Sequence, residues 1–153
     1  ADKFVANGFE IVLPHLFGPI GKIATGGNLL RVFCMRREFH LFENNRASPI
    51  VDWLKALCRD VRGAHKGVGV IGMCLTGNFA ISLMGDDSVL AAVSSQPSMP
   101  LMKAAELHMA PQEIAAVRQR IDATAPMHAY RFEGDPVCNA VKYRAIDAAF
   151  NND

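Results

Sequence analysis

The alternation of apolar and polar positions is clearest between residues 48 and 63. Apolar residues recur there at the three- and four-residue spacing of one helix face; they are Ile50, Trp53, Leu54, Leu57, Cys58 and Val61. Ser48 suits the N-cap of such a helix, and Pro49 suits its first turn, where a backbone N–H has no helical partner to lose. The pattern predicts a helix that ends near Gly63 and buries one face.

Short runs of β-branched and other apolar residues predict strands further along the chain. The predicted strands span residues 68–71, 89–93 and 127–132. Further helices are predicted over residues 111–121 and 137–150. Strands that alternate with helices predict an α/β fold class, with a mostly parallel sheet flanked by helices.

The first part of the chain is less regular. Residues 1–7 resemble the end of a helix, which Gly8 would stop, and the run FEIVL at 9–13 predicts a short buried strand halted by Pro14. The many glycines and prolines of residues 14–28 predict a loop. Residues 29–42 are amphipathic and predict a helix.

The stretch GVGVIGMCLTGNFAISLMG, residues 67–85, carries no charge in nineteen positions. Its length alone would permit a membrane helix. Five glycines and three polar residues argue against a span, and the β-branched half comes before the helix-forming half. A buried strand, a sharp turn and a helix explain the stretch better.

Composition limits the classes of function. The 153 residues suit a single domain over 1–153, and half of them are hydrophobic, which is typical of a globular chain. A net charge of +1 without a basic run gives no reason to expect a nucleic acid or a membrane as a partner. The first ten residues show no basic region followed by an apolar stretch, so no signal-peptide pattern is visible there, and we expect a cytoplasmic location.

Four cysteines lie far apart in the chain, at positions 34, 58, 74 and 138. A zinc site requires closely spaced ligand pairs, so we expect no metal, and no motif indicates a cofactor. Reduced thiols agree with a cytoplasmic protein, and for each cysteine the simplest interpretation is a small buried hydrophobic residue.

The turn Gly72-Met73-Cys74-Leu75-Thr76-Gly77 has the layout of a nucleophile elbow, in which one residue occupies a tight turn between a strand and a helix. Glycine two positions before the apex leaves room for the strained backbone. The N–H groups at the start of the helix favour a thiolate at Cys74 and stabilise a developing oxyanion. The alternative is an ordinary glycine-bounded turn with a buried cysteine.

This motif, with the PHLFG segment after the early apolar run and with RFEGDPVC near the end, resembles the dienelactone hydrolase family of α/β-hydrolases. The resemblance implies a partial α/β-hydrolase fold and hydrolysis of a small-molecule ester or lactone. It makes Cys74 the nucleophile, Leu75 the donor of one oxyanion N–H, and Asp135 the acid that orients a histidine. Thr76 and Asn78 depart from the usual glycines of the family motif.

The family histidine should follow Asp135, and no histidine lies after His128. Early strands of the family fold are also absent, so we expect a chain that lacks both ends of the domain. Unpaired sheet edges would then favour a homo-oligomer. Two alternatives to a hydrolase stay open: an inactive fragment that serves as a binding or assembly module, and a plain structural domain with Cys74 buried.

Three further polar positions are candidates for the site. Arg36 and Arg37 are substrate-binding candidates, because a guanidinium fork suits the carboxylate of family substrates; a solvated helix face is the alternative. Ser98, in the segment that follows the second predicted strand, should lie near the mouth of the site, where we interpret it as a turn residue.

Overall fold

The computed structural model describes residues 1–16, 48–98, 106–123 and 126–151. The chain divides into two compact units, residues 1–37 and 38–153. The predicted helix at 29–42 and most of the loop at 14–28 lie outside the described residues.

The N-terminal unit begins with the short helix α1, Asp2–Val5. Gly8 ends this turn with a φ of 82°, a left-handed conformation that glycine adopts without steric cost. The predicted end of a helix and its glycine stop are confirmed.

The predicted strand at 9–13 is wrong, because these residues adopt no regular secondary structure. The side chains of Phe9 and Leu13 are 62% and 78% exposed. An apolar run forms a strand only where a neighbouring strand pairs with it, and a local sequence window does not report that neighbour.

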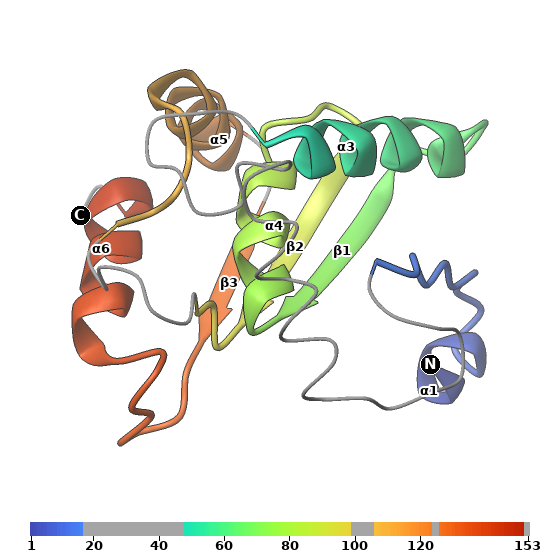
Figure 1. Cartoon of the computed structure of the whole chain (residues 1–153). Helices are drawn as coiled ribbons and strands as arrows, with labels where there is room; N and C mark the ends of the chain where they lie inside the picture. Colours follow the sequence, from blue (N-terminus) through green and yellow to red (C-terminus); the bar gives the residue numbers. More distant parts are fainter. Residues whose placement is uncertain (17–47, 99–105, 124–125, 152–153) are drawn as a thin grey trace. The chain divides into compact units, whose positions relative to one another are not determined.

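The second unit is built on a three-stranded sheet of β1 (Val68–Met73), β2 (Val89–Ser95) and β3 (Met127–Tyr130). The strands lie in the order β1-β2-β3, and both pairs are parallel (Figure 1). The predicted α/β class with a parallel sheet is confirmed.

The described residues of this unit form four helices beside the sheet: α3 (Pro49–Arg62), α4 (Leu75–Leu83), α5 (Pro111–Ala123) and α6 (Ala140–Phe150). The central helix α4 contacts β1, β2, α3 and α5. Every residue of α4 from Gly77 to Leu83 is buried. A helix enclosed on several sides explains why its part of residues 67–85 carries no charge. The prediction that the strand of this stretch is buried is wrong, because Gly72 is the one buried residue of β1.

Among the described residues, no helix is long and apolar enough to cross a membrane. The strand–turn–helix interpretation of residues 67–85 therefore holds, and the membrane-span alternative is wrong.

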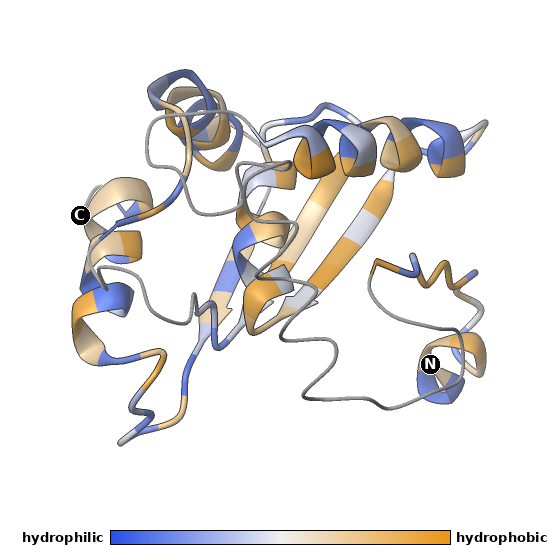
Figure 2. Cartoon of the chain, viewed as in Figure 1, coloured by the Kyte–Doolittle hydropathy of each residue, from blue (hydrophilic) through white to orange (hydrophobic). Residues whose placement is uncertain are grey.

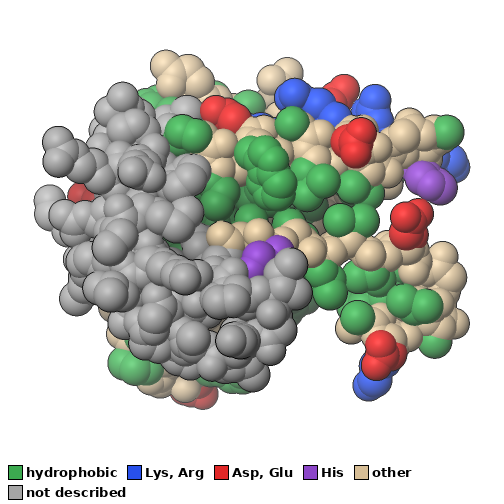
Figure 3. Space-filling model, turned by 45° about the vertical axis from the view of Figure 1, so that its right-hand side comes forward, with side chains coloured by type: hydrophobic (Ala, Val, Ile, Leu, Met, Phe, Trp, Pro, Cys, Tyr) green, Lys and Arg blue, Asp and Glu red, His purple; other side chains and the backbone are tan. Residues whose placement is uncertain are grey.

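Helix α3 is amphipathic, as predicted. It begins after Ser48 with Pro49 in its first turn and ends at Gly63, and it buries Ile50, Leu54 and Cys58. Hydrophobic positions of α3 face the sheet in Figure 2, and charged side chains line its outer edge in Figure 3. Trp53 departs from the predicted buried stripe, since half of its surface is exposed.

The carboxyl ends of the three strands are aligned. The last residue of β1, Met73, is the register partner of Ser95, the last residue of β2. Ser95 is in turn the partner of Tyr130, the last residue of β3. The segments that follow the strands therefore leave the sheet along one row, which places the predicted site residues of the second unit at a common edge.

One face of the sheet is open in this part of the structure. Ile71, Met73 and Tyr130 are each more than half exposed. Ile71 and Met73 are two positions apart on β1, and the register places Tyr130 in the row of Met73, so the three side chains share one face. The open face stands opposite the alternate positions Gly72 and Ser94, which are buried.

Candidate active site

Cys74 directly follows β1 and directly precedes α4. Its backbone has a φ of 56° and a ψ of −122°, a combination that L-residues other than glycine rarely adopt. The residue is exposed, so the thiol is not enclosed in the core. The predicted strained cysteine between a strand and a helix is confirmed, and the alternative of a buried cysteine in an ordinary turn is wrong.

The two glycines of the motif have different physical roles. A Cβ atom on Gly72 would overlap the carbonyl oxygen of Thr76 and lie 2.9 Å from the Gly77 nitrogen. A Cβ on Gly77 would lie 3.0 Å from Cα of Pro97 and 3.1 Å from Oγ of Ser94. Gly72 therefore lets the chain turn back on itself, and Gly77 lets α4 approach the end of β2.

The hydroxyl of Thr76 closes the same turn. It donates to the carbonyl oxygen of Met73 at 2.8 Å and accepts from the Met73 N–H at 2.9 Å. Thr76 was noted in the sequence only as a departure from a family glycine. Its side chain supplies two hydrogen bonds that a glycine lacks, so the departure stabilises the elbow locally.

Ser98 touches the cysteine. Its Oγ lies 3.0 Å from the Cys74 Sγ, and its backbone N–H donates to the Cys74 carbonyl at 3.2 Å. The buried Asn78 donates from Nδ2 to the Ser98 carbonyl at 3.1 Å. The interpretation of Ser98 as a turn residue misses this contact with the cysteine; the position of Ser98 shortly after a strand end is the signal that the sequence offers.

Leu75 is the first residue of α4, so its N–H has no acceptor within the helix. The N–H groups of this first turn lie beside Cys74, as the elbow motif predicts. A partial positive charge at a helix N-terminus stabilises a nearby anion. The geometry is compatible with the oxyanion role expected for Leu75.

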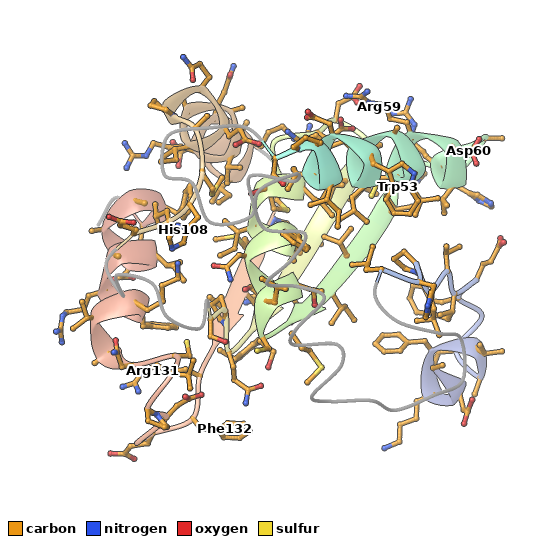
Figure 4. The ribbon with its side chains drawn as sticks, viewed as in Figure 1. Trp53, Arg59, Asp60, His108, Arg131 and Phe132 are labelled. Carbon is orange, nitrogen blue, oxygen red and sulfur yellow. The ribbon has the colours of Figure 1, made fainter. Side chains whose placement is uncertain are left out.

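Asp135 lies in the loop between β3 and α6, on the segment that leaves the same edge as Cys74. Figure 4 labels Arg131 and Phe132 on this segment, where it leaves β3. The Asp135 Oδ1 accepts from the N–H groups of Val137 and Cys138, at 2.8 and 2.9 Å. These bonds fix the loop before α6. The helix begins at Ala140 and not at the predicted Val137, because Asn139 is its N-cap and accepts from the N–H groups of Val141 and Lys142.

The thiol of Cys138, three residues after Asp135, is buried. Burial raises the pKa of Cys138 and the Asp135 carboxylate raises it further, whereas the charges of Lys142 and Arg131 lower it.

A second buried group lies on α6. Lys142 is 3% exposed, and its Nζ donates to the Glu106 carbonyl at 2.6 Å. Burial lowers the pKa of Lys142 to about 8. Burial also lowers the pKa of His108, which lies beside α6 (Figure 4), and the Lys142 charge lowers it further.

Histidine contacts do not complete a triad in the described part of the chain. Among the described residues, no hydrogen bond joins a histidine to Cys74 or to Asp135. The Cys74 sulfur contacts Ser98, and the Asp135 side chain accepts from backbone N–H groups. No group of three His, Cys, Asp or Glu side chains in that part could hold a metal ion. Arg36 and Arg37 lie outside the described residues.

A cavity of about 190 Å³ lies between α5, β3 and α6. Its lining includes Ile121, Met127, Ala129, Tyr143, Ile146 and Phe150. Cys74 is not among the lining residues of this cavity.

No family model, curated protein or solved structure matches the chain. The resemblance to dienelactone hydrolases therefore depends on the motifs in the sequence.

Proposed function

We propose that the chain is a hydrolase of dienelactone hydrolase type, which cleaves small-molecule esters or lactones through Cys74. The observation that supports this proposal best is the backbone of Cys74, with its φ of 56° on an exposed turn. Such a conformation costs about 1–3 kcal/mol and is concentrated at active sites. A cysteine whose only role was packing would not require it.

In the proposed reaction, the Cys74 thiolate attacks the carbonyl carbon and forms a C–S bond. The Leu75 N–H donates to the carbonyl oxygen as it becomes negative. The C–O bond then breaks, and the alkoxide leaves with a proton as the alcohol. Water attacks the resulting thioester, which releases the carboxylic acid and restores the thiol.

Asp135 is proposed to orient a histidine that serves as general base, and Arg36 and Arg37 to bind a substrate carboxylate. The location of Asp135 at the same sheet edge as Cys74 supports its role. The described cysteines, Cys58, Cys74 and Cys138, are free. Free thiols support a cytoplasmic location, where thiols remain reduced.

A second candidate is an inactive α/β-hydrolase fragment that serves as a binding or assembly module. The observation that favours it is the lack of a histidine hydrogen bond to Asp135 in the described part of the chain. Without a general base, the thiol would be acylated once and turnover would fall by orders of magnitude.

The test is acylation by p-nitrophenyl acetate, followed by release of nitrophenol and by peptide mass spectrometry. We expect one acetyl group on Cys74, formed faster in the folded chain than in the same chain unfolded in urea. Cys74→Ala should abolish the reaction, and the matched control Cys58→Ala should leave it unchanged. Repeated turnover would support the hydrolase, and a single burst would support the inactive fragment. Equal rates in folded and unfolded chains would contradict the proposed hydrolase.

A further inference from the structure

Ser98, in the segment after β2, contacts both the side chain and the backbone of Cys74. Three contacts converge there: the Ser98 hydroxyl on the Cys74 sulfur at 3.0 Å, the Ser98 N–H on the Cys74 carbonyl at 3.2 Å, and Asn78 on the Ser98 carbonyl at 3.1 Å. Ser98 is 3% exposed. The position of its hydroxyl is therefore set by the backbone on both sides of the contact, and water has little access to it.

The chemistry of the two groups indicates the direction of the hydrogen bond. A buried hydroxyl requires an acceptor for its proton, and among the described residues the Cys74 sulfur is the partner of the Ser98 Oγ. A thiol is a weak donor and a weak acceptor. A hydrogen bond to a charged acceptor is roughly twice as strong as a neutral one, so this contact is strongest when the sulfur is a thiolate.

We propose that Ser98 is a positioning residue that donates its hydroxyl proton to the Cys74 sulfur and increases the fraction of Cys74 present as thiolate. The inference rests on the proposed function, because it explains how the nucleophile is kept reactive. The opposite arrangement, in which the thiol donates to Ser98, would hold Cys74 in its protonated form. The two arrangements predict opposite effects when the hydroxyl is removed.

The experiment measures alkylation of Cys74 by iodoacetamide across a pH series, with the modified residue identified by mass spectrometry. For Ser98→Ala we expect alkylation at neutral pH to slow by about tenfold, the effect of losing one hydrogen bond to a charged group. The profile should move to higher pH and reach the same limiting rate. The titratable residues of the segment after β3, Asp135 and Cys138, are unchanged in all variants.

Ser95→Ala is the matched control, because the Ser95 hydroxyl donates to the Gln96 side chain at 3.0 Å and not to the cysteine. Ser98→Thr keeps the hydroxyl and should restore the original profile. A Ser98→Ala profile equal to that of Ser95→Ala, or one moved to lower pH, would overturn the inference. No ester is used, so this result is independent of the acylation test that decides the proposed function.

Discussion

A Cβ atom on Gly72 would overlap the Thr76 carbonyl oxygen. The two residues come together because the chain reverses direction at Cys74, between β1 and α4. The Thr76 hydroxyl bonds to both backbone groups of Met73 and closes the same turn. The shape of the elbow therefore depends on the absence of a side chain at Gly72.

Gly72→Ala should destabilise the fold by roughly 1–3 kcal/mol, or prevent folding, because the new methyl group meets backbone atoms that have little room to move. Gly69→Ala on the same strand is the control, since a Cβ there would have no neighbour within 4 Å. It should change the free energy of unfolding by less than about 0.5 kcal/mol. Urea unfolding followed by circular dichroism compares the two, and equal midpoints would contradict this account of the elbow.

The strained backbone at Cys74 should appear as stored free energy. Cys74→Gly should unfold at a higher urea concentration than Cys74→Ala, because glycine adopts this conformation without the steric cost. The free energies of unfolding of the two variants should differ by about 1 kcal/mol or more. Glycine at an unstrained position has the opposite effect, so the sign of the difference is diagnostic. If the alanine variant were the more stable, Cys74 would not be strained.

Lys142 should make stability depend on alkaline pH. Its pKa is about 8 in the folded chain against an ordinary 10.5, so between these values the unfolded chain binds more protons. The contribution of Lys142 to the free energy of unfolding is therefore lowest below pH 8, and it rises by about 3 kcal/mol as the pH increases to 10.5.

Lys142→Met should flatten this alkaline rise, and the exposed Lys66→Met should leave it in place. Urea unfolding across the pH range measures both variants. A rise that persists in Lys142→Met would assign the effect to another group.

Asp86 should stabilise the loop between α4 and β2. Burial alone would raise the pKa of Asp86, but hydrogen bonds from Ser88 and the Arg59 guanidinium at 2.5 Å together lower it. A lowered carboxyl pKa stabilises the fold above the ordinary carboxyl range, and that contribution is lost as the pH falls through the folded pKa.

Asp86→Asn should cost about 1–3 kcal/mol at neutral pH, because it removes a charged acceptor from a buried site. Asp87→Asn is the control, since Asp87 is 76% exposed and its oxygen lies 3.8 Å from Arg62. Thermal unfolding measures both variants at neutral and at acidic pH, and their unfolding temperatures should differ most at neutral pH. If the stability lost in Asp86→Asn were as large at acidic pH as at neutral pH, the role assigned to Asp86 would be contradicted.

The sequence predicted the elements that local pattern determines. The helix from Pro49 and the three strands of the sheet were found because periodicity and β-branched content describe a half-buried surface. The run at 9–13 was misassigned because pairing depends on residues distant in the chain. The elbow was recognised from Gly72 and Gly77, whose small size the backbone requires.

The contacts around the cysteine could not be predicted in the same way. Ser98 meets Cys74 because the ends of β1 and β2 are in register, and register is a property of the sheet that no single segment contains. The bonds that Asp135 accepts from the N–H groups of Val137 and Cys138 differ in this respect. They join residues two and three positions apart, and local bonds of this kind are typical of aspartate in a turn.

The alignment of the three strand ends has a consequence for the order in which the chain folds. β1, α4 and β2 follow one another directly in the chain, so the pairing of β1 with β2 closes only a short loop. The pairing of β3 with β2 closes a longer loop, which contains α5. We therefore expect the elbow and Ser98 to form early, and Asp135 to arrive in a later step. During refolding, Cys74 would adopt its native backbone conformation before Asp135 reaches the edge of the sheet. The chain would then pass through an intermediate in which the elbow is formed and the segment of Asp135 is not yet in position.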